Sequence, residues 1–191
     1  FIDTVTALIK RSANINIQDK KSLTALSTAA KLGYDRIALK LIAAGASPMA
    51  ADKHGRSTVW YASDLGLTSL LKLLLKQGAN PNVKDRKHQT PLMRASVKGH
   101  LDAVNLKALL AKGANVNNKN KTDNTALLIA AELGHIDVIS ALLSYGASTT
   151  QVNKLGNTAI SLAKNEGHIE AIKTLNAYEK GAQGLLKRLA K

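Results

Sequence analysis

A glycine that returns at nearly constant intervals constrains the fold of this chain more than any other feature. Gly33, Gly66, Gly99, Gly134 and Gly167 follow one another at spacings of 33, 33, 35 and 33 residues. Similar residues surround each of them, in the segments LTALSTAAKLGY, RSTVWYASDLGL, QTPLMRASVKGH, NTALLIAAELGH and NTAISLAKNEGH. A period of about 20–50 residues is typical of a solenoid, in which each unit buries its apolar side against its neighbours.

Each unit has the pattern of two short helices followed by an extended hairpin. A Ser or Thr precedes the first helix, where its hydroxyl can accept a hydrogen bond from a free backbone N–H. These residues are Thr24, Ser57, Thr90, Thr125 and Thr158. Small residues such as Ala29-Ala30 follow, which lets neighbouring helices approach closely, and the recurring glycine ends the helix in a left-handed conformation. The second helix carries an apolar pair such as Leu41-Ile42, and a Gly-Ala pair such as Gly45-Ala46 leads into the hairpin.

This unit resembles the ankyrin repeat, most closely at Thr90-Pro91-Leu92, Gly99-His100 and residues 113–117. The resemblance covers residues 1–180 and implies an all-α solenoid of helix-turn-helix units joined by hairpin loops. It divides the chain into a half repeat at 1–18, repeats at 19–51, 52–84, 85–119, 120–152 and 153–180, and a basic tail at 181–191. It also implies that Asp19, Asp52 and Asp85, which open three of the units, are structural acids of the hairpins.

The chain departs from the family pattern in three ways. The His that usually follows the Leu is replaced in every repeat, so the hydrogen bonds that it makes to the hairpin are not expected here. Repeat three has two extra residues, which we place near Asn105-Leu106. We expect them to form a bulge or a longer turn. This insertion is either a tolerated change without a function or a local recognition feature. Finally, the chain begins within a second helix, so we expect residues before Phe1, because a solenoid needs capped ends.

The tail is the segment after the last repeat. Residues 181–184 (GAQG) interrupt the pattern, and residues 185–191 (LLKRLAK) form a short basic amphipathic segment. We expect it to cap the last repeat or to fray, with a membrane-surface or partner helix as the alternative.

No catalytic pattern is present, so the sequence predicts no enzyme, no catalytic residues, no cofactor, no metal and no small-molecule substrate. The chain has no cysteine, and it lacks the common serine-nucleophile, phosphate-loop and zinc-binding motifs. His100, His135 and His168 follow the recurring glycine, which indicates a structural role for all three. His54 and His88 lie in adjacent hairpins, but no third ligand for a metal accompanies them.

The net charge of +14 is unevenly distributed. Residues 1–119 hold 19 Lys and Arg against 7 acids, whereas residues 120–191 hold 8 against 6. In the first three repeats the hairpins contain no acid besides the Asp that opens each unit, and loops of random composition would mix the two signs. The pattern therefore predicts a positive stripe along the first three repeats, although a compositional bias toward Lys and Asn, typical of an AT-rich bacterial or parasite genome, is the alternative.

The resemblance implies that partners bind to hairpin tips and to the inner face of the first helices. We therefore expect a protein-binding scaffold whose partner has an acidic surface, with Tyr61 as an exposed anchor and Trp60 buried. The expected partner-binding residues are Lys20, Lys21, Lys53, His54, Arg56, Tyr61, Asp64, Leu65, Lys84, Arg86, Lys87, Gln89, Arg94, Val97, Lys98, Lys119 and Lys121. The alternative is electrostatic binding to a polyanion, either nucleic acid or an anionic membrane.

The chain is expected to be a monomer on its own. No apolar stretch reaches the length of a membrane span, because the longest candidate, residues 70–75, has only six residues and includes Lys72. A cytoplasmic location fits this pattern, but the compartment stays open.

Overall fold

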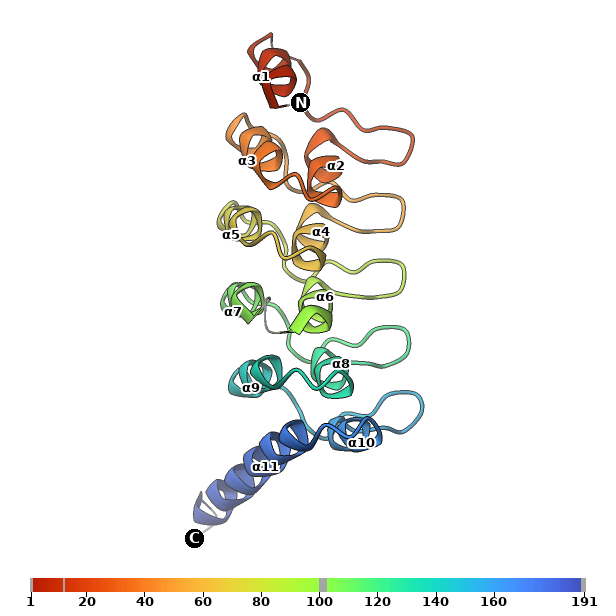
Figure 1. Cartoon of the computed structure of the whole chain (residues 1–191), viewed down its shortest axis with the longest axis vertical. Helices are drawn as coiled ribbons and strands as arrows, with labels where there is room; N and C mark the ends of the chain where they lie inside the picture. Colours follow the sequence, from red (N-terminus) through yellow and green to blue (C-terminus); the bar gives the residue numbers. More distant parts are fainter. Residues whose placement is uncertain (1, 12, 100–102, 190–191) are drawn as a thin grey trace.

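The computed structural model describes residues 2–11, 13–99 and 103–189, and the side chains of residues 2–11, 13–99 and 104–181. Within them the chain forms eleven helices and no strand, so the predicted all-α solenoid is confirmed. The helices stand in two columns with the hairpins projecting on one side (Figure 1). The first helices of the repeats are α2 (Ala25–Lys31), α4 (Thr58–Asp64), α6 (Pro91–Lys98), α8 (Ala126–Glu132) and α10 (Ala159–Asn165). The second helices are α1 (Ile2–Lys10), α3 (Asp35–Ala43), α5 (Thr68–Lys76), α7 (Ala103–Ala111), α9 (Ile136–Ser144) and α11 (Ile169–Leu189).

The first helices begin at the predicted hydroxyl caps. In each, the side chain of the cap accepts a hydrogen bond from the backbone N–H three residues later, at 3.2–3.3 Å. In the first and last repeats this third residue is Ser27 or Ser161, whose hydroxyl accepts a bond from the N–H of the cap in return. The serines stand where the family usually has His, and they satisfy the helix start instead of the hairpin.

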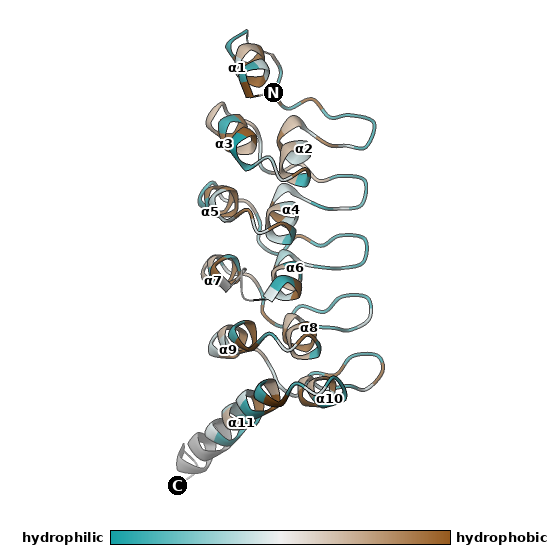
Figure 2. Ribbon diagram, viewed as in Figure 1, coloured by the Kyte–Doolittle hydropathy of each residue, from teal (hydrophilic) through white to brown (hydrophobic). Residues whose placement is uncertain are grey.

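The core lies between the two columns of helices and runs the length of the solenoid. Leucines of the second helices, such as Leu70, Leu71 and Leu74, are completely buried against small residues of the first helices, such as Ala62 and Ala95. Figure 2 shows the hydrophobic residues on the helices and the hydrophilic ones along the hairpins. Because Ala allows close approach, neighbouring repeats pack tightly, and Trp60 and Tyr61 of α4 are the large aromatic side chains buried in the described part of this core.

The extra residues of repeat three lie between α6 and α7, so the prediction that they fall near Asn105-Leu106 is wrong. Both of these residues belong to α7, and both are fully buried. Helix α7 ends two residues before Gly113, just as α3 ends two residues before Gly45. An insertion inside α7 would turn its apolar side out of the core by about 200°. The longer connection, of which residues 100–102 lie outside the described part, keeps the helix in register.

The two ends of the solenoid differ from the middle. Helix α1 stands in the column of second helices, and an apolar groove of about 410 Å³, lined by residues such as Val5, Ile9, Ala29 and Leu32, separates it from α2. At the other end α11 is one helix of 21 residues. The backbone of residues 181–184, which interrupt the repeat pattern, continues this helix. The side chains of residues 182–191, including most of the basic tail, lie outside the described part.

Two histidines connect consecutive repeats, as their position after the recurring glycine predicted. The ring Nε2 of His135 donates to the carbonyl oxygen of Val97 at 3.1 Å, and that of His168 donates to Glu132 at 3.0 Å. Since a carbonyl only accepts, the proton resides on Nε2 in both rings. Each ring also lies against the glycine of the preceding repeat: a Cβ added to Gly134 would come within 2.7 Å of the His168 ring. His100 lies outside the described residues.

Replacing Gly134 by Ala should therefore destabilise the array more than the same change at Gly167. Both glycines have φ near 70°, which costs a residue with a Cβ about 1–2 kcal/mol, but only Gly134 has a neighbour within 4 Å of the added Cβ. We expect Gly134→Ala to cost about 1–2 kcal/mol more than Gly167→Ala in urea unfolding, because the His168 ring must leave its hydrogen bond. In a His168→Ala background this excess should disappear. Equal losses of stability in the two glycine variants would show that the His168 ring moves aside without a measurable cost.

Candidate functional site

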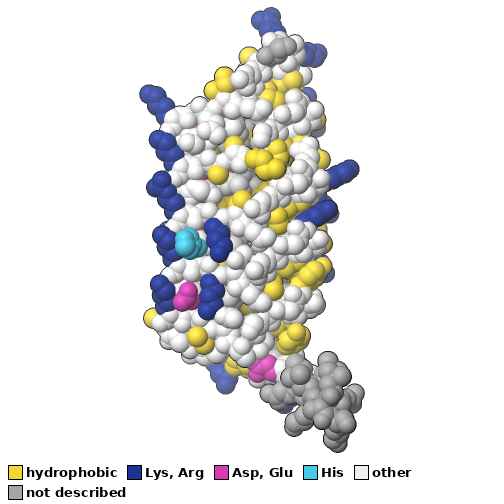
Figure 3. Space-filling view, turned by 180° about the vertical axis from the view of Figure 1, so that it is seen from behind, with side chains coloured by type: hydrophobic (Ala, Val, Ile, Leu, Met, Phe, Trp, Pro, Cys, Tyr) yellow, Lys and Arg dark blue, Asp and Glu magenta, His cyan; other side chains and the backbone are white. Residues whose placement is uncertain are grey.

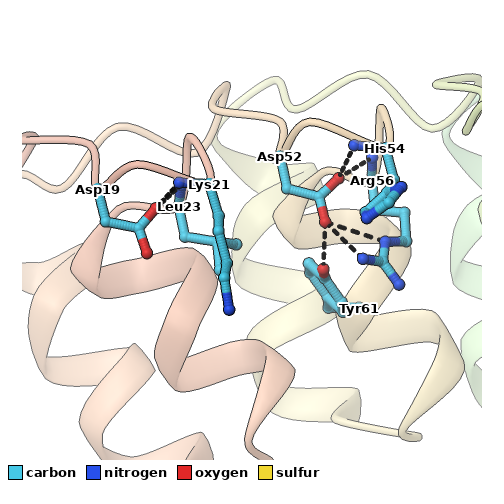
Figure 4. Close-up of polar contacts among 7 residues, drawn as sticks. All are labelled: Asp19, Lys21, Leu23, Asp52, His54, Arg56 and Tyr61. Atoms are coloured by element: carbon cyan, nitrogen blue, oxygen red, sulfur yellow. Dashed lines mark hydrogen bonds and ion pairs between the residues drawn. The ribbon is translucent and has the colours of Figure 1, made fainter.

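Each hairpin is built on the carboxylate or amide that opens it. Oδ1 of Asp52 accepts hydrogen bonds from the N–H groups of His54 at 2.8 Å and Arg56 at 2.9 Å, and Asp19 accepts from Lys21 and Leu23 in the same way (Figure 4). Asn120 and Asn153 do this in the last two hairpins. The fourth residue then takes a left-handed conformation, with φ between 59° and 77° in all five hairpins that follow from residue 19 onward. The side chains of the second and third residues are thus left free at the tip.

Backbone hydrogen bonds between neighbouring hairpins hold these tips in register. The second residue of one hairpin donates its N–H to the carbonyl of the third residue in the hairpin before it. The bonds run from Lys53 to Lys21, Arg86 to His54, Lys121 to Lys87 and Lys154 to Thr122, at 2.8–3.1 Å. Equivalent side chains of successive repeats are therefore aligned by the backbone itself.

The register collects basic residues into two columns. The tip column consists of the second residues of the hairpins, which are Lys20, Lys53, Arg86, Lys121 and Lys154. All five are exposed. The third residues form a second column that is basic only in the first three repeats, at Lys21, His54 and Lys87, and continues as Thr122 and Leu155. Figure 3 shows the basic side chains gathered along the hairpin edge.

Sequence reasoning missed Lys154 as a member of the tip column. The sequence pattern could have identified it, because Lys154 follows Asn153 just as Lys121 follows Asn120. The low net charge of residues 120–191 obscured it.

The predicted binding residues divide by exposure. The exposed ones are Lys20, Lys21, Lys53, His54, Leu65, Lys84, Arg86, Lys87, Lys98 and Lys121. The half-buried ones are Arg56, Asp64, Gln89, Arg94, Val97 and Lys119. Tyr61 is buried, with 4% of its surface exposed, so the prediction that it is an exposed anchor is wrong. Trp60, at 6%, is buried as predicted.

Tyr61 is buried because its hydroxyl completes the coordination of a hairpin acid. It donates to Oδ2 of Asp52 at 2.6 Å, and the same oxygen accepts from Nε and Nη2 of Arg56 at 3.0 and 2.8 Å. Burial opposes the ionisation of Asp52, but the bonds from Tyr61, Arg56 and His54 outweigh it and lower its pKa to about 2. Burial, and then the bond to Asp52, raises the pKa of Tyr61. Asp52 is therefore a charged structural centre.

Two guanidinium groups lie over the ring of Trp60. The guanidinium carbon of Arg56 lies 5.6 Å from the centre of the Trp60 ring, and that of Arg94 lies 5.1 Å from it. Arg94 also pairs with Asp64 of the preceding repeat, through Nε at 2.9 Å and through Nη2. Asp64 and Arg94, both predicted to bind a partner, thus connect α4 to α6, and stacking on Trp60 orients the arginines.

Exposed apolar side chains lie at the ends of the first helices. Leu32, Leu65 and Leu133 occupy the same position after α2, α4 and α8, and 56%, 44% and 42% of their surfaces are exposed. Lys98 and Glu166 take this position in the other two repeats. An apolar surface of this kind retains its contribution to binding at high salt, unlike the charged columns.

The contacts of Asp52 predict a specific dependence of stability on pH. Because its pKa is about 2 when folded and 3.8 as a free side chain, Asp52 stabilises the fold above pH 4 by about 2 kcal/mol, which is lost as the pH falls toward 2. Asp52→Asn should therefore cost about 2 kcal/mol in urea unfolding at pH 7 and little at pH 2.

Asp85→Asn serves as the control for this variant. Among the described residues, the Asp85 side chain accepts hydrogen bonds only from the backbone N–H groups of Lys87 and Gln89, and Asn120 accepts the equivalent two bonds in the next hairpin. Its replacement should change the stability by less than about 0.5 kcal/mol. Equal effects of the two substitutions would contradict the role given to Tyr61 and Arg56.

The comparison with known families agrees with this geometry. A family model for ankyrin repeats, three copies long, matches residues 1–85, 59–153 and 92–187, which together span nearly the whole chain. No curated protein matches the sequence of this chain significantly. None of the helices in the described ranges combines the length and apolarity that crossing a bilayer requires. The chain therefore belongs to the ankyrin-repeat family, whose members generally mediate interactions between proteins and are typically not enzymes.

Proposed function

We propose that this protein binds a partner protein with an acidic surface through its hairpin edge. The observation that carries the proposal is the tip column, in which five cations occupy the same position of five hairpins aligned by backbone hydrogen bonds. Side chains placed in this way add their fields along one line, which speeds the encounter with an acidic partner and orients it.

The hairpin acids of the first three repeats are turned toward the hairpin backbone, and the basic residues of these hairpins outnumber them. Oδ1 of Asp19, Asp52 and Asp85 is engaged by two backbone N–H groups in each case. Asp52 is in addition paired with Arg56. The tip cations Lys20, Lys53 and Arg86 have no ion pair among the described residues.

The exposed leucines favour a protein partner over a polyanion. Leu32 and Leu65 lie at the ends of the helices that carry the basic hairpins, and a protein can cover them, whereas a phosphate backbone cannot. Binding of single-stranded nucleic acid uses exposed aromatic side chains beside the charged groove. Trp60 and Tyr61, the two aromatic residues next to the basic columns, are buried.

Charge reversal at the hairpin tips should abolish partner capture. We expect Lys20→Glu, Lys53→Glu and Lys121→Glu together to weaken binding by at least about tenfold, because they replace attraction by repulsion along the tip column. The measurement is capture of a discrete protein from nuclease-treated lysate at low and moderate salt, followed by titration of that protein. Arg56 is left intact, because reversing it would break its pair with Asp52.

The matched control is Lys72→Glu, Lys107→Glu and Lys112→Glu. It changes the net charge by the same amount at exposed sites on or next to the second helices α5 and α7. Retained capture in this variant, with loss in the tip variant, supports the proposal. Equal loss in both variants would contradict a specific edge. Release of all bound material by nuclease would instead indicate a polyanion, and the proposed protein partner would be wrong.

A further inference from the structure

Among the pockets of the hairpin edge, one combines cations with an indole ring and so has a chemistry more specific than that of a charged stripe. It has a volume of about 300 Å³ and lies between the second and third hairpins. Arg56 of the second hairpin and Arg86 and Lys87 of the third line it, together with Trp60 of α4 and Arg94 of α6. Four cationic side chains and one indole ring from four segments therefore meet in a single depression.

Two of these cations are held in place and still have hydrogen-bond donors to offer. Arg56 and Arg94 each use Nε and Nη2 for a carboxylate, Asp52 and Asp64 respectively. Neither Nη1 group has a partner among the described residues. Both guanidiniums stack on the same Trp60 ring, which fixes their orientation before any ligand arrives.

The other two cations are exposed and, within the described part of the chain, unpaired. Arg86 and Lys87 are exposed, and neither side chain takes part in an ion pair or hydrogen bond within the described part of the chain. They can therefore move onto an anion that enters between the hairpins. A preorganised pair of arginines with two adjustable cations above it is a suitable arrangement for binding a carboxylate.

The charge balance identifies the class of anion. The four cations are accompanied by three carboxylates, since Asp85 lines the pocket wall and Asp52 and Asp64 pair with the arginines. One positive charge remains, which a single carboxylate neutralises.

We infer that this pocket receives one Glu or Asp side chain of the partner protein and so selects where an acidic surface docks. The inference rests on the proposed function, and it adds a specific anchor to a general electrostatic attraction. Anchors of this kind sit in preformed pockets near the centre of an interface, while surrounding charges mainly guide the encounter.

Trp60 makes the pocket directly measurable, because it is the only tryptophan in the chain. The full chain is titrated with the capped peptide Gly-Glu-Gly-Glu-Gly, with its Gln counterpart, and with inorganic phosphate, while tryptophan emission is recorded. We expect a saturable change with the Glu peptide, none with the Gln peptide, and weaker binding of phosphate. No change with the Glu peptide, or tighter binding of phosphate, would overturn the assignment.

Two double variants separate the pocket from the general field of the stripe. Arg86→Gln with Lys87→Gln removes the two exposed pocket cations, and Lys20→Gln with Lys53→Gln removes the same charge from tips outside the pocket. We expect the first pair of substitutions to weaken binding of the Glu peptide at least about tenfold, and the second pair to weaken it by less than about threefold. Equal weakening by both pairs would overturn the pocket.

Partner capture distinguishes failure of the pocket from failure of the proposed function. If Arg86→Gln with Lys87→Gln leaves capture intact while reversal of the tip column abolishes it, the hairpin edge binds the partner and the pocket does not. If neither change affects capture, the partner binds elsewhere and both proposals are wrong. Loss in both cases, together with the peptide result, supports the pocket as the anchor.

Discussion

The hydrogen bonds accepted by the first side chain of each hairpin are the constraint on which the rest of this surface depends. Two backbone N–H groups converge on one oxygen of Asp52 or its equivalent, which closes the hairpin and turns its second and third residues outward. Asn120 and Asn153 show that the geometry needs the oxygen and not the charge. The bonds between neighbouring hairpins then carry one local shape into a register along the whole array.

Within this regular framework, repeat two has a separate role. Its hairpin acid is the one that binds a tyrosine and an arginine, and its first helix carries the tryptophan on which Arg56 and Arg94 stack. A solenoid is stabilised by contacts between neighbours, so this cluster connects repeats two and three as well as shaping the surface between them. The carboxylates hold one edge of Arg56 and of Arg94, and the Nη1 group of each arginine has no hydrogen-bond partner among the described residues.

Much of this arrangement could be predicted from the sequence. The glycine spacing and the hydroxyl caps correctly predicted the repeats, because both depend on backbone conformations that only certain residues adopt. The roles of His135 and His168 also followed from their position. The burial of Tyr61 could not be predicted in this way, because it depends on a hydrogen bond to Asp52, nine residues earlier in the chain. The place of the insertion was missed as well, since burial of Asn105 and Leu106 depends on packing between columns.

The sequence by itself determined the period, the ends of most helices and the basic character of the hairpins, since these depend on residue type and local spacing. Only the tertiary structure decided which cations share a column and which meet in a pocket. Lys53, Arg86 and Lys121 are separated by more than thirty residues each, and they are aligned by backbone hydrogen bonds between hairpins. The pairing of Arg94 with Asp64 likewise spans two repeats. Contacts between repeats depend on how the units stack, and no local pattern in the chain encodes them separately.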